Sequence, residues 1–207
     1  MFRDTAARFL AENPLVSSFI IAAIFYHYWQ IGDERTLWRR RHLIGIIVAS
    51  VIAVSVTGII RPWLHWPSPS RAEGFRDLFP AYLWGTGNEN SFPSHSTLVY
   101  ILVAFGFWPL SRTISVLSAV FVLVCVSLPR IYVGGHYPID VLATLPLAVA
   151  VLLPVSLWAA DSELANTLVR LFSAGGWAGF ILFGWFFELA EGFGSLADLI
   201  RRIAKLQ

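Results

Sequence analysis

The sequence predicts an all-α protein, a polytopic transmembrane helical bundle with about six membrane segments. Of its 207 residues, 57% are hydrophobic and only 14% are charged, and the mean hydropathy is +0.65. These values exclude a typical soluble domain. Several apolar stretches approach the roughly 20 residues needed to cross a hydrocarbon core of about 30 Å. The nine tryptophans and sixteen phenylalanines fit aromatic belts at the two membrane surfaces. A formal net charge of +2 is too small to indicate a nucleic-acid partner.

The chain is expected to begin with an amphipathic segment over residues 1–13 that lies on the membrane surface. The first span covers Pro14–Ile31 and starts with a proline, which the first turn of a helix tolerates. No small-residue cleavage site follows this span, so we expect it to remain in the mature protein. A basic connection comes next, and such connections normally stay in the cytoplasm. Binding of anionic lipid is an alternative use for its arginines. These are Arg35, Arg39, Arg40 and Arg41.

Five further spans are predicted from the remaining apolar stretches. They are Leu43–Ile60, Pro93–Pro109, Thr113–Leu128, Ile139–Trp158 and Leu168–Phe187. Residues 195–207 are expected to form a capped amphipathic tail whose basic side chains lie at lipid headgroups. We interpret residues 1–207 as one integral-membrane domain. Because this number of crossings puts the basic tail opposite the arginine-rich connection, the side on which the tail lies stays open.

Three polar segments open on one face of the predicted bundle, opposite the arginine-rich connection. They are Arg61-Pro62 at the end of the second span, Pro93–Ser96 at the start of the third, and Arg130–Asp140 between the fourth and the fifth. Charged and polar side chains are costly next to lipid. Their convergence at one depth therefore indicates a functional site.

The residue types in these segments suit a phosphoryl group. Arg61 and Arg130 carry planar, permanently charged guanidinium groups that match the oxygens of a phosphate. Ser94, His95 and Ser96 stand at the start of a helix, so their backbone N–H groups would form a cradle for an anion.

His136 can act as a nucleophile if a carboxylate holds its other ring nitrogen, and Asp140 follows it by four residues. The histidine would attack phosphorus, a second acid would protonate the leaving oxygen, and water would cleave the phosphohistidine. The sequence has no cluster of carboxylates suited to Mg²⁺ and no Cys/His spacing suited to Zn²⁺. We therefore expect no metal and no cofactor.

The stretch "PRIYVGGHYPIDVLA" closely resembles the third signature of the type 2 phosphatidic acid phosphatase family. That signature reads serine-arginine, five residues, histidine, three residues, aspartate, and Arg130, His136 and Asp140 match it. Two weaker resemblances precede it. "RPW" is similar to the end of the first signature, lysine, six residues, arginine-proline, and "SFPSHST" to the second, proline-serine-glycine-histidine.

This resemblance covers about Val54–Leu142 and implies a helical bundle that acts on lipid phosphates and pyrophosphates. It also implies a phosphohistidine intermediate on one residue, a carboxylate that relays protons, and a set of phosphate-binding residues. In this sequence His136 would carry the phosphoryl group and Asp140 would relay protons. The phosphate-binding residues would be Arg61, Arg130 and Ser94, with Ser96 beside them.

The chain departs from the family pattern. The family's lysine would fall at Val54, and Arg71 or Arg76 could replace it only by folding back. Pro129 stands where serine is usual.

The second signature also departs. An ungapped alignment places Ser96 at the family's acid-base histidine, whereas a one-residue deletion places His95 there. We favour His95 as the proton donor, since serine is a poor acid at neutral pH.

The sequence therefore predicts a metal-independent phosphatase of membrane lipids in a bacterial inner membrane, with its site on the extracytoplasmic face. Undecaprenyl pyrophosphate is a reasonable substrate, and phosphatidylglycerol phosphate, phosphatidic acid and lipid A phosphate remain open. A phosphotransferase that uses the same histidine is one alternative. A catalytically weak lipid-phosphate binder, or a transport subunit, is another. The oligomeric state is left open.

Overall fold

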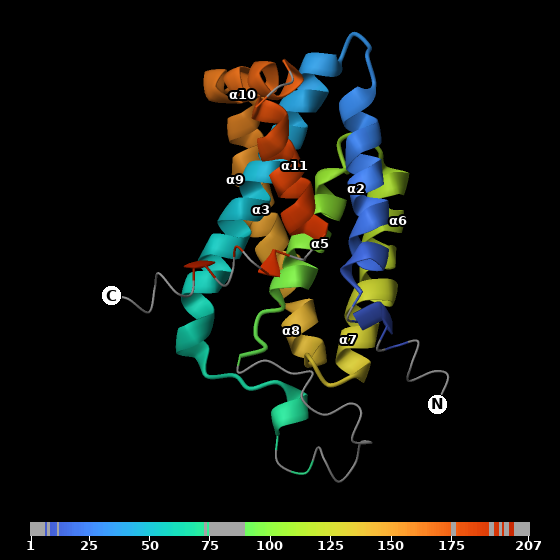
Figure 1. Ribbon diagram of the computed structural model, residues 1–207, viewed down its shortest axis with the longest axis vertical. Helices are drawn as coiled ribbons and strands as arrows, with labels where there is room; N and C mark the ends of the chain where they lie inside the picture. Colours follow the sequence, from blue (N-terminus) through green and yellow to red (C-terminus); the bar gives the residue numbers. More distant parts are fainter. Residues whose placement is uncertain are drawn as a thin grey trace.

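The computed structural model (Figure 1) describes residues 7, 9–11, 13–72, 74, 90–174, 177–190, 193, 194, 196, 199 and 200. Over these residues the regular structure is helical, as predicted. Most of the expected surface segment 1–13 and of the expected tail 195–207 lies outside the described residues, as does Arg76.

The described residues form the following helices, in chain order. They are α2 (Pro14–Gln30), α3 (Thr36–Leu64), the 3₁₀ turn η1 (Pro69–Arg71), α5 (His95–Gly106), α6 (Arg112–Phe121), the π-helical turn η3 (Val122–Ser127), α7 (Leu128–Tyr132), α8 (Pro138–Leu142), α9 (Thr144–Asp161), α10 (Glu163–Ser173) and α11 (Trp177–Ala190).

Among the residues that the structure describes, three helical stretches are long and apolar enough to cross a membrane. They are Thr36–Arg71, Arg112–Tyr132 and Pro138–Asp161, of 36, 21 and 24 residues. The last two correspond to the predicted fourth and fifth spans, extended by a few residues at their ends. The structure thus confirms the all-α fold, with three candidate membrane spans among the described residues.

Helix α5 forms the centre of the bundle. Every residue from Ser96 to Ala104 is buried, as expected for a helix that is apolar on all sides. It packs against α3, α6 and α9. The Tyr100 hydroxyl donates to the Leu189 carbonyl of α11 at 2.9 Å, so this buried polar group is paired across two helices. The outer helices expose leucines and valines, for example Leu153 and Leu157 of α9, which suits contact with lipid.

The arginine-rich segment is helical, which corrects the prediction of a connecting loop. Asp33 and Thr36 bond to each other at its start, since the Asp33 N–H donates to Thr36 Oγ1 at 2.7 Å and the Thr36 N–H donates to the Asp33 carbonyl at 3.0 Å. Helix α3 therefore begins at Thr36. At a rise of 1.5 Å per residue its 29 residues span about 43 Å, more than a hydrocarbon core.

Three consecutive arginines at this end of α3 bind the ends of other helices. Arg39 donates to the Ile31 carbonyl at 2.9 Å and Arg40 to the Trp29 carbonyl at 3.1 Å. Arg41 donates to the Ala160 carbonyl of α9 at 2.8 Å and to the Asn166 side chain of α10. The last carbonyls of a helix have no partner within the helix. The arginines supply that partner together with a favourable charge.

The predicted sixth span, Leu168–Phe187, is wrong as a single helix. Helix α10 ends at Ser173 and lies across the end of the bundle where α3 begins, and α11 runs back along the bundle (Figure 1). The charged and polar side chains of α10 explain the break, because they would be costly inside the membrane. Helix α11 is anchored by the Trp185 indole, which donates to Ser50 Oγ at 3.0 Å and lies 4.6 Å from the ring of Phe25.

We predict that Arg41→Ala lowers the free energy of unfolding in detergent by about 1–2 kcal/mol, because it removes charged hydrogen bonds to α9 and α10. Arg112→Ala is the matched control. Arg112 is exposed and lies over the Trp108 ring at 5.6 Å, so its loss should change stability far less. Thermal or denaturant unfolding of both variants tests this, and equal destabilisation by the two changes would contradict it.

Candidate active site

The three predicted polar segments meet at one end of the bundle. Arg61 lies in the last turn of α3, Ser94 precedes the first turn of α5, and the turn between α7 and α8 carries His136. In Figure 1 this is the end at which α7, α8 and η1 gather, away from α10. Hydrogen bonds between the segments connect them. The Ser94 N–H donates to the Asp140 carbonyl at 3.3 Å, and the Ser70 N–H donates to the Gly134 carbonyl at 2.9 Å.

A two-glycine turn brings His136 next to Arg130. Gly134 adopts a φ of 75°, a left-handed conformation that glycine tolerates best. The Gly135 N–H donates to the Arg130 carbonyl at 2.8 Å, and a Cβ at this position would lie 3.3 Å from that carbonyl oxygen. Pro138 then starts α8 with its fixed φ. The turn is therefore tight, and it sets where His136 points.

Both ring nitrogens of His136 have neighbours. Nδ1 lies 3.1 Å from the Ser91 carbonyl and 3.6 Å from Oδ2 of Asp140. Both neighbours only accept hydrogen bonds, so Nδ1 carries the proton. Asp140 is completely buried, and its Oδ2 accepts from the Tyr137 N–H at 2.8 Å. Nε2 lies 3.2 Å from Ser94 Oγ. The lone pair of the imidazole therefore faces Ser94.

Burial lowers the pKa of His136 below its usual value of 6.5. The hydrogen bond and the charge of Asp140 oppose this shift and raise the pKa, whereas the positive charges of Arg130 and Arg61 lower it further. At neutral pH the ring is therefore uncharged and Nε2 holds its lone pair. Both guanidinium groups therefore act on the charge of His136.

Arg61 lies against His95. Its Nη1 donates to Nδ1 of His95 at 2.7 Å, and its Nη2 donates to the Asn90 carbonyl. Because a guanidinium cannot accept a hydrogen bond, Nδ1 of His95 is the acceptor and the ring proton of His95 lies on Nε2. That nitrogen is 3.4 Å from Ser96 Oγ. His95 and Ser96, the two candidates for one role, are therefore in contact.

Arg130 has donor capacity left in the part of the chain that the structure describes. Its Nε donates to the Ala11 carbonyl at 3.4 Å, while Nη1 is buried with no hydrogen-bond partner among the described atoms. A buried donor without a partner is costly in a native protein. An anion with several oxygen acceptors would satisfy it.

The anion cradle is only partly as predicted. The Ser94 N–H is already bonded to the Asp140 carbonyl, so we do not count it among the donors of the cradle. Val54, at the position of the family's lysine, is fully buried in the apolar core. Arg71 lies exposed in η1, and its role as a replacement stays a prediction.

Several contacts around the site were not predicted. Asn90 Oδ1 accepts from the Trp66 N–H at 3.0 Å, and the Trp66 carbonyl accepts from the Ser91 N–H at 2.7 Å. These bonds hold the segment before α5, whose Ser91 carbonyl contacts His136. In the sequence, the polar residues of this connection were the only sign of these hydrogen bonds, because the pairing of the residues depends on how the chain folds.

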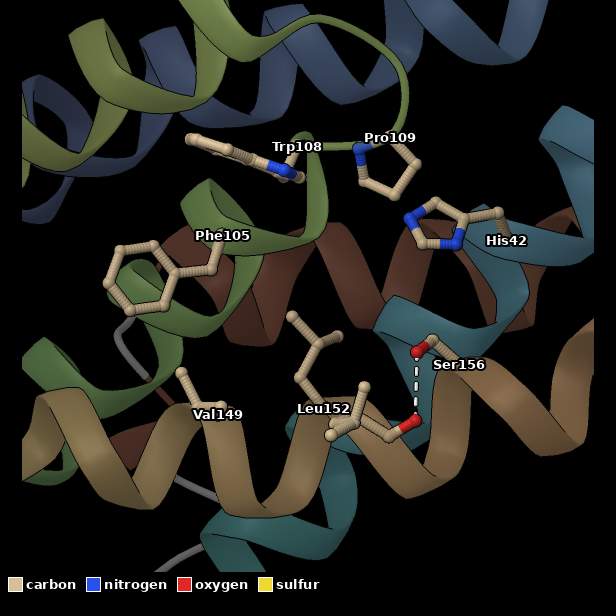
Figure 2. A pocket seen from close by; sticks show the side chains of 8 residues that line it. His42, Phe105, Trp108, Pro109, Val149, Leu152 and Ser156 are labelled. Atoms are coloured by element: carbon tan, nitrogen blue, oxygen red, sulfur yellow. Dashed lines mark hydrogen bonds between the residues drawn. The ribbon is translucent and has the colours of Figure 1, made fainter.

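A cavity of about 280 Å³ lies elsewhere, between α3, α5 and α9 (Figure 2). Its polar side chain His42 contacts the Gly106 carbonyl at 2.6 Å and stacks on Trp38. His42 and Arg61 are separated by about 28 Å along α3, given the helical rise per residue. This apolar cavity is therefore distinct from the candidate active site. Among the described residues no group of three or more His, Cys, Asp or Glu side chains could hold a metal ion.

Comparisons with known proteins agree with the resemblance seen in the sequence. The profile of the PAP2 superfamily matches residues 41–163, which include Arg61, Arg130, His136 and the other predicted site residues. "Undecaprenyl-diphosphatase BcrC" of Bacillus subtilis (strain 168) is 25% identical over 148 residues, which is 72% of this chain and 70% of that protein. No solved structure matches the chain.

We predict that the pKa of His136 lies below 6.5 and that Asp140→Asn lowers it further, because the carboxylate that favours the charged ring is lost. NMR titration of ¹³C-labelled histidine, with His136→Gln to assign the signal, measures both values. Asp33→Asn is the control, since this carboxylate is exposed and lies at the other end of the bundle. A pKa that rises in Asp140→Asn would contradict the arrangement.

Proposed function

The chain belongs to the PAP2 superfamily, the type 2 phosphatidic acid phosphatases, and from this membership and the site geometry we propose that it removes phosphate from a membrane lipid through a phosphohistidine at His136. The observation that carries the proposal is the state of the imidazole. Its Nδ1 proton is held by the Ser91 carbonyl and by Asp140, and its Nε2 lone pair is directed to the side where Ser94 lies.

In the proposed first step, Nε2 of His136 attacks phosphorus and the bond from phosphorus to the leaving oxygen breaks. Asp140 stabilises the positive charge that develops on the ring. Arg61 and Arg130 neutralise the phosphate oxygens, and the buried Nη1 of Arg130 gains its acceptor there. In the second step, water attacks the phosphohistidine, phosphate leaves and the Nε2 lone pair returns.

His95 is the proposed proton donor to the leaving oxygen. A neutral imidazole is too weak an acid for this role, so His95 would donate from Nε2 as an imidazolium, with Nδ1 protonated as well. In the structure Nδ1 accepts from Arg61, so Arg61 would have to turn from His95 to the phosphate before His95 takes up this proton. In the second step the same nitrogen can accept a proton from the attacking water. Ser96 lies beside it and would orient it by the contact of Ser96 Oγ with Nε2.

We propose six membrane segments, formed by α2, α3, α5, α6 to α7, α8 to α9, and α11. Arg39, Arg40 and Arg41 lie at the end of α3 opposite Arg61. Basic segments stay in the cytoplasm. The site would therefore face the extracytoplasmic side of a bacterial cytoplasmic membrane, where it meets lipid phosphates at headgroup depth.

Undecaprenyl pyrophosphate is our proposed substrate. The support is the distant relative, whose printed name is an undecaprenyl-diphosphatase. Arg61 and Arg130, whose charges both act on His136, suit the charge of a pyrophosphate. Other lipid phosphates have the same reacting group, so a panel of lipids is required to choose among them.

A phosphotransferase is the second candidate. Val54 replaces the family's lysine by an apolar side chain, so one phosphate cation is absent from that position. A site altered in this way could pass the phosphoryl group to a lipid or sugar hydroxyl instead of water. A lipid-phosphate binder without turnover would form no phosphohistidine.

We predict that the purified protein releases phosphate from undecaprenyl pyrophosphate without an added acceptor, and that His136→Asn lowers the rate at least about a thousandfold, because the nucleophile is lost. EDTA should have no effect. His65→Asn is the matched control, because His65 is exposed and asparagine tolerates its left-handed backbone. The panel also includes phosphatidic acid and phosphatidylglycerol phosphate. Release only with an added hydroxyl acceptor would identify the transferase, and no release from any lipid would contradict both.

We predict that His95→Asn slows hydrolysis of a lipid phosphate by about 10²–10⁴-fold, because the alkoxide leaves without a proton. With p-nitrophenyl phosphate, whose leaving group needs no proton, the loss should be much smaller. Ser96→Ala should retain activity within a few-fold on both substrates, as expected for loss of one neutral hydrogen bond. If Ser96→Ala instead loses much more activity on the lipid phosphate than on p-nitrophenyl phosphate, Ser96 and not His95 is the proton donor.

A further inference from the structure

The apolar cavity between α3, α5 and α9 has room for one hydrocarbon chain. Its volume of about 280 Å³ is slightly below the roughly 300–1,000 Å³ of a pocket for a whole small molecule. Figure 2 shows Trp108 and Pro109 on one side of the cavity and Val149 and Leu152 on the other. Apolar cavities stay free of water and take up apolar molecules, because water finds no polar partners in them. An apolar occupant is therefore expected.

Two polar side chains in the lining of the cavity already have partners within the protein. His42 Nε2 lies 2.6 Å from the Gly106 carbonyl and donates to it, since a carbonyl only accepts. Ser156 Oγ donates to the Leu153 carbonyl of its own helix at 2.9 Å, which is the dashed line in Figure 2. Neither hydrogen bond requires a polar ligand, and the other lining side chains are aromatic or aliphatic.

Close helix contacts next to the cavity fix the spacing of its walls. A Cβ added at Gly45 of α3 would lie 3.0 Å from Cβ of Ala159 in α9. A Cβ added at Gly106 of α5 would lie 2.5 Å from the Ile46 side chain of α3. Helix α3 therefore already touches both neighbours where these glycines lie. Side chains that face an unfilled void lose dispersion contacts, and a hydrocarbon chain in the cavity would restore them.

The cavity lies beside exposed aromatic side chains at the end of the bundle where α3 begins. Trp108 lines it and is 51% exposed. Trp38 is 42% exposed and stacks on His42 with the ring centroids 6.0 Å apart. Tryptophans at the ends of membrane helices mark the level of the lipid headgroups. The headgroup of a lipid whose chain fills the cavity would therefore lie at this end.

Arg112 supplies a cation at the rim of the cavity. It is the first residue of α6, it is exposed, and its guanidinium lies 5.6 Å from the centroid of the Trp108 ring. Among the residues that the structure describes, no carboxylate forms an ion pair with Arg112, whereas Asp33 pairs with Arg39. A guanidinium binds the oxygens of a phosphate with parallel hydrogen bonds. Charge complementarity therefore favours an anionic headgroup at this position.

We propose that the cavity binds one acyl chain of an anionic phospholipid from the surrounding bilayer, and that the phosphate of the same lipid pairs with Arg112. The proposed reaction takes place at His136, at the opposite end of the bundle. The bound phospholipid is therefore not a substrate, and this site is separate from the proposed function. The lipid covers the apolar lining and joins the start of α6 to α9.

Native mass spectrometry tests the headgroup, with phosphatidylglycerol and phosphatidylcholine of identical acyl chains as probes. We expect the protein to retain one phosphatidylglycerol in preference to phosphatidylcholine. Arg112→Gln should weaken retention of phosphatidylglycerol about fivefold, the effect of one arginine near an anionic headgroup, and should remove the preference. Arg35→Gln is the matched control and should change neither, because Arg35 is also exposed and lies at the same end of the bundle, directly before α3.

Two substitutions that fill the cavity test the position of the chain. Ser156→Leu and Val149→Phe should each lower retention of both lipids at least about tenfold, because excluding about two buried methylene groups already has this effect. Leu157→Phe is the control, since Leu157 lies on the same helix, is 66% exposed and does not line the cavity. Thermal unfolding in detergent checks that each variant folds. The two fillings come from different turns of α9, so one of them suffices if the other does not fold.

Photo-crosslinking locates the chain directly. Phosphatidylglycerol with a diazirine in one acyl chain should label the lining residues Phe105, Val149 or Leu153. Labels confined to other helices, equal retention of the two lipids, or unchanged retention in both filled variants would each overturn the inference. A lipid-free dimer, in which a second copy covers the cavity, would also overturn it. None of these measurements depends on phosphate release, so a failure of the proposed function leaves them unaffected.

Discussion

The pairing of the His136 imidazole with the Ser91 carbonyl and Asp140 is the interaction on which the arrangement of the site depends. It fixes which nitrogen carries the proton, and it requires three chain segments to meet. Asp140 must lie in the first turn of α8, Ser91 must approach from the segment before α5, and Gly134 must turn the chain after α7. The bonds from Trp66 to Asn90 and Ser91 then join the end of α3 to the same cluster. The contacts around the His136 imidazole thus bring these helix ends together.

Arginines have different uses at the two ends of the bundle. At one end, Arg39, Arg40 and Arg41 bind helix-terminal carbonyls, so their charges are consumed in joining α2, α9 and α10 to α3. At the other end, the charges of Arg61 and Arg130 lower the pKa of His136. The first set stabilises the fold by binding helix-terminal carbonyls, whereas Arg61 contacts His95 and Arg130 keeps a buried Nη1 without an acceptor among the described residues, where an anion can bind. The two sets of arginines thus differ in their contacts and not in their residue type.

The sequence indicated which polar segments meet at one end of the bundle, but not the contacts behind them, and the catalytic roles of their residues stay a prediction. The spacing of Arg130, His136 and Asp140 follows from a single turn between two helix ends, and such a local pattern is readable along the chain. The division of the sixth span into α10 and α11 was missed because its apolar residues continue across the break. The arginine-rich segment was predicted to be a connecting loop because its charge was given more weight than its helix propensity. The hydrogen bond between Thr97 and Ser127 joins residues thirty positions apart, and no periodicity in one segment could reveal it.

The apolar side chain at Val54 bears on where positive charge can lie in this protein. Val54 and Arg61 are seven residues apart on α3, so they share nearly the same face and are separated by about 10 Å along the axis. A lysine at that depth would have to lose much of its hydration inside the bundle, which is costly without a partner. Arg61 and Arg130 lie instead near helix ends, at the same end of the bundle as His136. Among the described residues the positive charge that acts on His136 thus comes from the ends of α3 and α7 and not from the middle of α3.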